Sequence, residues 1–181
     1  MLAPDALMEQ MSKFVLYEPL QREKKPYRNH LAANTLVRQA VREALSHSLG
    51  KNASKYVKAW APVAGALFTH KFGVTVQNGI VYGAADGLSF EVPEAEDRQK
   101  EIDSLIGAIS DVRDLDRSLP LAAMILPPKR QTTAYRNTLQ VLNDRDVIVL
   151  HDERDAEQWT RSAMTNLITN NSLGVSTRLA P

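Results

Sequence analysis

Alternating apolar and polar residues between Val74 and Val92 are interrupted twice by dipeptides typical of tight turns. Asn78-Gly79 and Asp86-Gly87 favour the positive φ angles that two-residue hairpin turns require. The pattern therefore predicts an antiparallel meander of three strands at residues 74–76, 80–82 and 88–92.

Helical spacing of apolar residues predicts a helix on either side of this meander. The first spans residues 31–49, with Asn29 as its N-terminal cap and Gly50 as its stop. Residues 54–73 are predicted to form a second helix, broken by Pro62. A helix from Glu96 to about Arg113 follows the meander, with acidic residues at its start and basic residues at its end.

The C-terminal part alternates buried strands with helices. Residues 119–126 are almost wholly apolar and stop at Pro127-Pro128, which predicts a strand buried on both sides. A helix begins after Thr132 or Thr133, a second buried strand covers 147–150, and a last helix covers 155–168. Two buried strands joined by a helix are expected to be parallel.

These elements predict an α/β fold with a mixed sheet: an antiparallel meander, then two helix-connected strands, with helices on both faces and further helices at the N-terminus. The charged stretch 21–26 separates an N-terminal arm or helix at 1–25 from a single domain at 26–169, and 170–181 is expected to be a flexible tail.

The amino-acid composition excludes several kinds of functional site. The chain has 181 residues, a net charge of +1 and no cysteine, so disulfides, thiol catalysis and cysteine-bound zinc are excluded. The sequence contains no apolar stretch long enough to cross a bilayer and no signal-peptide pattern, so we expect a cytoplasmic protein without a membrane partner.

The order of elements resembles the restriction-endonuclease-like nuclease superfamily, most closely over residues 88–139. Residues 89–92 resemble the strand that carries the family's glutamate, and 122–129 resemble the next core strand and its exit. The helix that contains Tyr135 also has a counterpart in some type II restriction enzymes. The match covers about half the chain.

The resemblance implies a Mg²⁺-dependent nuclease site, in which two carboxylates bind the metal and a lysine helps to activate water. Glu91 matches the second carboxylate and Asp86 is the candidate for the first, so both are metal-ligand candidates. Pro93 occupies the position of the family's lysine, and Lys100 is the candidate that replaces it. Asp86, Glu91 and Lys100 are thus the predicted catalytic residues.

Simpler interpretations of the same residues stay open. Asp86 is well suited to form the turn with Gly87, and alternation alone places Glu91 on a solvated sheet face. A different acidic group, at 151–155, follows the last strand. Asp152, Glu153 and Asp155 could bind magnesium there as in toprim-like nucleases or primases, although Asp155 equally suits a helix cap.

Basic residues gather at several points and are candidates for phosphate contacts with DNA or RNA, or are part of a solvated surface. The predicted nucleic-acid-binding residues are Lys24, Lys25, Arg28, Lys129, Arg130 and Arg136.

The sequence thus favours a nucleic-acid-associated protein with a nuclease-like core, either catalytically degenerate or an atypical Mg²⁺-dependent nuclease, of a type found in mobile genetic elements. The alternative is a non-catalytic interaction or structural subunit that binds a protein partner or a second copy. Trp60, Phe68 or the N-terminal arm would then cover the partner.

Overall fold

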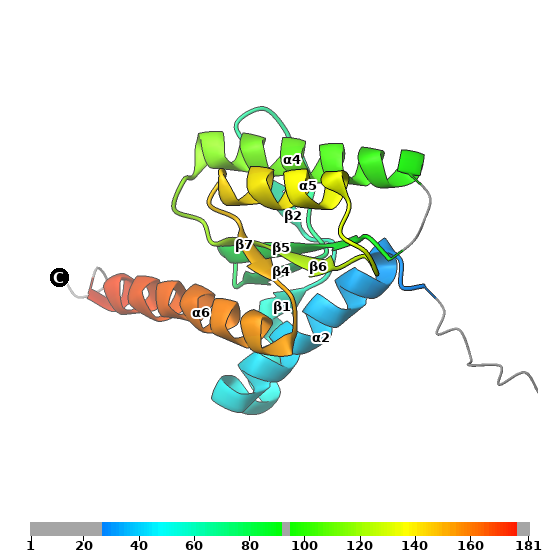
Figure 1. Cartoon of the computed structure of the whole chain (residues 1–181). Helices are drawn as coiled ribbons and strands as arrows, with labels where there is room; N and C mark the ends of the chain where they lie inside the picture. Colours follow the sequence, from blue (N-terminus) through cyan, green and yellow to red (C-terminus); the bar gives the residue numbers. More distant parts are fainter. Residues whose placement is uncertain (1–26, 92–94, 177–181) are drawn as a thin grey trace, which may run out of the picture.

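The computed structural model describes residues 27–91 and 95–176, within which the strands form one five-stranded and one two-stranded sheet (Figure 1). The larger sheet has the order β1 (Val57–Lys58), β4 (Val74–Gln77), β5 (Val81–Ser89), β6 (Leu121–Leu126) and β7 (Ile148–Leu150). The pairs β1–β4 and β4–β5 are antiparallel, whereas β5–β6 and β6–β7 are parallel. The predicted mixed α/β sheet is therefore confirmed.

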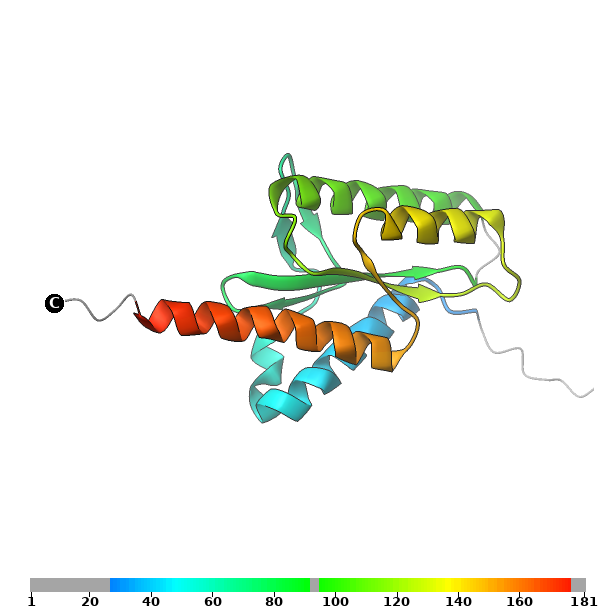
Figure 2. The same cartoon turned by 60° about the vertical axis from the view of Figure 1, so that its left-hand side comes forward.

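Helices cover both faces of this sheet, as Figures 1 and 2 show. On one face lie α2 (His30–Leu49) and α6 (Glu153–Ser176), and on the other lie α4 (Ala95–Leu115) and α5 (Thr133–Asn143). A short helical segment, η1 (Gly50–Asn52) and α3 (Ala53–Tyr56), links α2 to β1. The small sheet pairs β2 (Pro62–Ala64) with β3 (Thr69–Lys71) beside α4.

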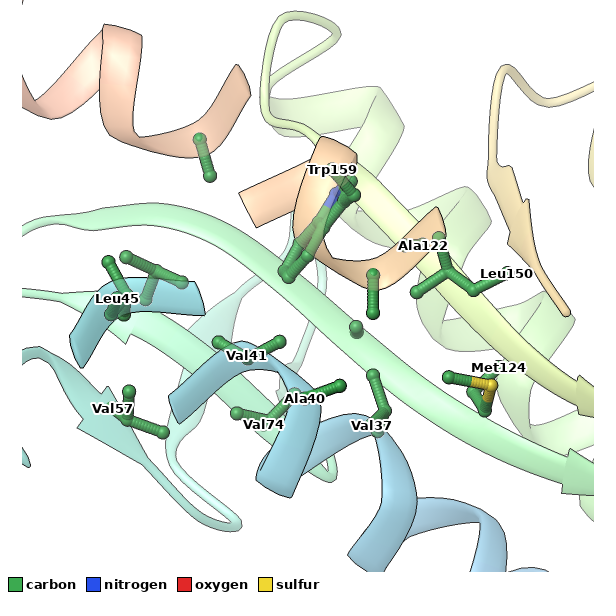
Figure 3. Close-up of a cluster of buried hydrophobic side chains, with 14 of the residues drawn as sticks. Val37, Ala40, Val41, Leu45, Val57, Val74, Ala122, Met124, Leu150 and Trp159 are labelled. Carbon is green, nitrogen blue, oxygen red and sulfur yellow. The ribbon is translucent and has the colours of Figure 1, made fainter. Parts of the chain in front are cut away.

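Strand β6 is buried on both faces, as its apolar sequence predicts. Ala122 and Met124 pack with α2 and α6 in the core cluster shown in Figure 3, which also contains Trp159. Leu121, Ala123 and Ile125 belong to the opposite cluster with α4 and α5. Two apolar layers therefore fix the parallel strands between the helices.

The capping residues expected for two of the helices, α2 and α5, are confirmed. The Asn29 side chain accepts a hydrogen bond from the main-chain N–H of Ala32, and Gly50 ends α2 at φ 57°. Thr132 caps α5 by accepting from the N–H of Tyr135. The last helix, in contrast, runs to Ser176 and so includes residues 170–176, for which the sequence predicts a flexible tail.

The prediction of a second tight turn at Asp86-Gly87 is wrong. A turn does form at Asn78-Gly79, with Gly79 at φ 76°, but Gln77 pairs with Val81, so the connection has three residues instead of the two predicted. Strand β5 then continues without a break through Asp86 and Gly87 to Ser89. The third antiparallel strand is β1 and not residues 88–92. Gly87 has another role, because a Cβ there would lie 2.6 Å from the Cβ of Ala33 and from the N of Asn34. Glycine thus lets α2 lie directly against β5.

The predicted broken helix at 54–73 is also wrong, since this segment contains β1, β2 and β3 after the single turn of α3. Val57, Val63 and Phe72 are buried, whereas Trp60, Leu67 and Phe68 are exposed. The spacing of the apolar residues in this segment fits a helix, but its β-branched valines and Pro62 favour short extended strands. The arm at 1–25 lies outside the described residues.

Candidate functional site

A cavity of about 370 Å³ brings the predicted residues Asp86 and Lys100 together. Parts of α2, the β1–β2 connection, β3, β5 and α4 line it. We refer to it as the Asp86 pocket. Its lining consists of His30, Trp60, His70, Lys71, Asp86, Lys100, Glu101, Ser104, Leu105 and Ala108.

Side chains of α2 hold β5 in place at this pocket. β4 pairs with β5 only as far as Ala85, so beyond it that edge of β5 has no strand partner among residues 27–91 and 95–176. Asn34 Oδ1 accepts from the N–H of Gly87 at 3.0 Å, and His30 Nδ1 lies 2.6 Å from the Gly87 carbonyl oxygen. These side chains therefore supply the hydrogen bonds that another strand would otherwise make.

The Asp86 carboxyl is largely enclosed by this network. Burial raises its pKa above the ordinary value, although hydrogen bonds from the N–H of Gly87, from Asn34 and from the N–H of Gly73 oppose the rise. The bond from Gly87 is 2.8 Å long. Asp86 thus holds a proton more readily than an exposed aspartate does.

Glu91 has different partners, at the carboxyl end of β5. Its carboxylate accepts from Arg28 Nε at 3.0 Å and from the main-chain N–H of Arg28 at 3.0 Å, and it also pairs with Nη2 of that residue. Hydrogen bonding from the Arg28 side chain is the main reason why the pKa of Glu91 lies below its ordinary value. This ion pair fixes the start of α2 against β5.

The two carboxylates predicted to share a magnesium ion therefore have separate surroundings, because Glu91 does not line the Asp86 pocket. Across residues 27–91 and 95–176, no three acidic or histidine side chains are grouped as a metal site would require. Lys100 lies at the pocket rim, 77% exposed, with Nζ 3.6 Å from Asp97 Oδ1. Pro93, which replaces the family's lysine, lies outside the described residues.

Cations and an aromatic ring meet where β5 and β6 end. Parallel neighbours end at the same sheet edge, so Arg28 and Glu91 at β5 lie beside Lys129 at the exit of β6. Lys129 Nζ stands 5.0 Å from the centre of the Tyr27 ring, which is 51% exposed. We call Tyr27, Arg28, Lys129, Arg130 and Arg136 the basic edge.

Most of the basic edge is open to solvent. Lys129, Arg130 and Arg136 are exposed. The described part of the chain contains no ion-pair partner for the Arg130 and Arg136 guanidinium groups. Lys24 and Lys25, which belong to the same prediction, fall outside the described residues.

The acidic group after β7 has local structural roles. Asp152 Oδ1 accepts from the N–H groups of Arg154 and Asp155, so Asp152 is the cap of α6 and the assignment of the cap to Asp155 is wrong. Asp155 Oδ2 instead accepts from the N–H of His151. A second cavity, of about 360 Å³, lies at the same sheet edge and is lined by Arg28, Leu36, Met124, Leu126, Pro127 and residues 151–154.

Sequence reasoning missed several residues of the Asp86 pocket. His70 and Lys71 fall in the segment predicted as a helix, and only the pairing of β2 with β3 brings them to the cavity. Lys100, Ser104 and Ala108 repeat every four residues on α4, which is a pattern that marks one helix face. That pattern could have indicated Ser104, whereas no sequence signal marked His30.

Comparison with protein-family models, with curated proteins and with solved structures found no match. In the part of the chain that the structure describes, no helix is both long and apolar enough to span a membrane.

Proposed function

We propose that this protein binds nucleic acid through the basic edge and does not cleave it by the two-carboxylate magnesium mechanism. The observation that carries the proposal is the position of Lys129 over Tyr27, beside Arg28, at the common carboxyl edge of β5 and β6. Lysine and arginine contact phosphates, and an exposed aromatic ring offers a surface for base stacking. Arg130 and Arg136 add cations that no acidic partner neutralises among the described residues.

The absence of cleavage is proposed from the partners of Glu91. A metal ligand has to offer its oxygens to the ion, whereas both oxygens of Glu91 accept hydrogen bonds from Arg28. Asp86, with its raised pKa, lies in a different pocket. The mixed sheet would then serve as a scaffold for binding.

The test is the salt dependence of oligonucleotide binding, measured by fluorescence anisotropy with single-stranded and duplex probes. We expect the double variant Lys129→Ala/Arg130→Ala to bind more weakly. The slope of log K against log salt should fall by about 0.7 for each phosphate of a single strand that the variant no longer neutralises.

The matched control is Lys51→Ala/Lys55→Ala, which removes two exposed cations from η1 and α3. Binding equal to that of the native protein is expected there. If all three proteins bind equally, or if none binds at low salt, the proposal fails. Magnesium-dependent cleavage that is abolished by Glu91→Ala would contradict the proposal that the protein does not cleave nucleic acid by the two-carboxylate mechanism.

A second candidate function, docking to another protein chain, is favoured by the β2–β3 loop. Leu67 and Phe68 are 79% and 68% exposed, and the loop tip projects beyond α4 in Figures 1 and 2. Asp111 on α4 accepts from the N–H groups of both residues at 2.8 and 2.9 Å. An apolar tip held in one conformation loses little entropy on binding.

Self-association is the form of docking that the purified chain can show by itself. Sedimentation equilibrium should detect association that Phe68→Ser weakens and Ile80→Ser does not, since Ile80 is comparably exposed at the β4–β5 turn. Equal molar masses for the three proteins at the monomer value would contradict docking between copies.

A further inference from the structure

The Asp86 pocket combines features that the basic edge does not explain. It is a polar cavity of about 370 Å³, within the range of small-molecule sites. Five separate segments of the chain contribute to it, and its lining includes an aromatic ring, two lysines, the half-buried carboxyl of Asp86 and a hydroxyl. The residues that carry the argument are Trp60, Lys71, Asp86, Lys100 and Ser104.

Trp60 has an unusual backbone conformation at this cavity. Its φ is 53°, in the left-handed region that a bulky side chain rarely adopts. The residue nevertheless remains 39% exposed, with its ring centre 6.3 Å from that of His30. Strained residues of this kind cluster at binding sites, where the fold holds a side chain in position.

The buried side of the pocket is organised before any ligand arrives. The Nδ1–H of His30 donates to the Gly87 carbonyl oxygen, so its Nε2 accepts from Asn34 Nδ2 at 3.0 Å. Both ring nitrogens of His30 are thus engaged. Asp86, which is half-buried, lines the cavity beside this network, and its carboxyl group has acceptor sites beyond the three used by Gly87, Asn34 and Gly73.

The open side carries positive charge. Lys71 is exposed at the end of β3, and Lys100 makes only a long ion pair with Asp97 on the surface. Exposed pairs of this kind contribute little to stability, so an anionic ligand can replace Asp97 at small cost. Glu101 also lines the cavity, which favours a ligand with hydrogen-bond donors over a bare anion.

We propose that the Asp86 pocket binds a single nucleoside monophosphate unit, with the base stacked on Trp60 and the phosphate held by Lys71 and Lys100. Asp86 and Ser104 form hydrogen bonds to the base or sugar. The inference rests on the proposed nucleic-acid binding and deepens it, because one unstacked nucleotide of a bound single strand supplies this chemistry. A free nucleotide supplies it equally.

Tryptophan fluorescence of the full chain gives a direct test. The chain has two tryptophans, and Trp159 is only 1% exposed, so of the two only Trp60 can stack with an added nucleotide. Saturable quenching by nucleoside monophosphates, by a short single-stranded oligonucleotide, or by both is expected. Quenching by the oligonucleotide alone assigns the base to a strand, and quenching by monophosphates alone assigns it to a free nucleotide.

Variants separate the pocket from the basic edge. Trp60→Gly suits the positive φ and removes the ring, and calorimetry should show monophosphate affinity falling between roughly five-fold and a hundred-fold. Trp60→Tyr should retain more of the affinity. Lys100→Ala should weaken binding of the monophosphate more than binding of the unphosphorylated nucleoside.

Two results would overturn the inference. The first is the absence of Trp60 quenching while oligonucleotides still bind by anisotropy, which would leave the proposed function intact. The second is equal monophosphate affinity in the native protein and in Trp60→Gly. Loss of oligonucleotide binding in Lys129→Ala/Arg130→Ala with unchanged monophosphate quenching would support two distinct sites. If Lys129→Ala/Arg130→Ala leaves the oligonucleotide affinity unchanged and monophosphates still quench Trp60, the proposed binding at the basic edge fails and the inference about the Asp86 pocket stands.

Discussion

Asp86 in β5 and Glu91 just beyond the end of that strand lie five positions apart in two different chemical environments. The Asp86 carboxyl is enclosed by α2 and accepts from Gly87, Asn34 and Gly73, whereas the Glu91 carboxylate pairs with Arg28 near solvent. Burial raises the pKa of the first, and hydrogen bonding lowers the pKa of the second. Opposite shifts of this kind come from surroundings and not from residue type.

Replacing Asp86 by Asn tests the buried carboxyl. Since its pKa is higher in the folded than in the unfolded chain, ionisation of Asp86 lowers stability as pH rises above the usual carboxyl range. We expect Asp86→Asn to unfold at a higher temperature than the native protein at pH 7, with the difference shrinking as pH falls through the pKa of Asp86. A difference that grows toward acid pH would contradict the raised pKa.

The close approach of α2 to Gly87 can be tested by comparing alanine substitutions at Gly87 and at Gly107. A Cβ at Gly87 would lie 2.6 Å from main-chain and side-chain atoms of α2, whereas a Cβ at Gly107 would meet nothing within 4 Å. Overpacking predicts that Gly87→Ala lowers the free energy of unfolding by about 1 to 3 kcal/mol. Gly107→Ala should be neutral or stabilising by up to about 1 kcal/mol, because alanine favours helix. Urea denaturation measures both, and equal effects would contradict the close approach of α2.

At the scale of elements, long periodic stretches were predictable and short ones were not. The helices at 30–49 and 95–115 and the strand at 121–126 each bury a continuous apolar face. Their apolar patterns therefore fit only one type of secondary structure. Residues 57–72 form pieces of two or three residues, whose apolar spacing also fits a helix. At Asp86-Gly87 the local preference for a turn gave way to pairing with β6 on one side and to hydrogen bonds with Asn34 and His30 of α2 on the other.

The β2–β3 loop depends on one carboxylate of α4. Asp111 accepts from the N–H groups of Leu67 and Phe68 and pairs with His70 Nε2 at 2.7 Å. Burial opposes ionisation of Asp111, but these hydrogen bonds outweigh it and its pKa lies below the ordinary value. The fold at this position therefore favours the ionised form.

Asp111→Asn should loosen the loop without unfolding the sheet. We expect faster hydrogen exchange at the amides of Leu67 and Phe68, with unchanged exchange in β6, whereas the exposed Asp114→Asn serves as control. In the native protein, ionised Asp111 stabilises the fold at pH values above the pKa that Asp111 has in the unfolded chain. This stabilisation is lost as the pH falls through the lowered pKa of Asp111 in the folded chain. Unchanged exchange in Asp111→Asn would show that the loop is held by other contacts.

At the scale of the whole molecule, the sequence identified part of the candidate site. It named Asp86 and Lys100, which share a pocket, and Arg28 and Lys129, which share a sheet edge. It could not separate Glu91 from Asp86, because that separation depends on Arg28, sixty-three positions earlier than Glu91. It also could not place Trp60 or Lys71, since their positions follow from the misassigned segment.

The three parallel strands share one sheet edge. β5, β6 and β7 all end at one edge, where the cations, Tyr27 and the second cavity lie. The Asp86 pocket is lined by β3, by α4 and by His30, which lies two residues after Arg28 of the basic edge. A single strand of nucleic acid that crosses the basic edge would therefore have the pocket nearby for one of its bases.

Mapping amide chemical shifts by NMR during titration with a single-stranded oligonucleotide tests the central proposal most directly. We predict the largest, salt-sensitive shifts at Tyr27, Arg28 and residues 129–136, with a second group at Trp60, Lys71 and Lys100. Shifts that are absent at low salt, or that are confined to the Leu67–Phe68 loop, would contradict the proposal.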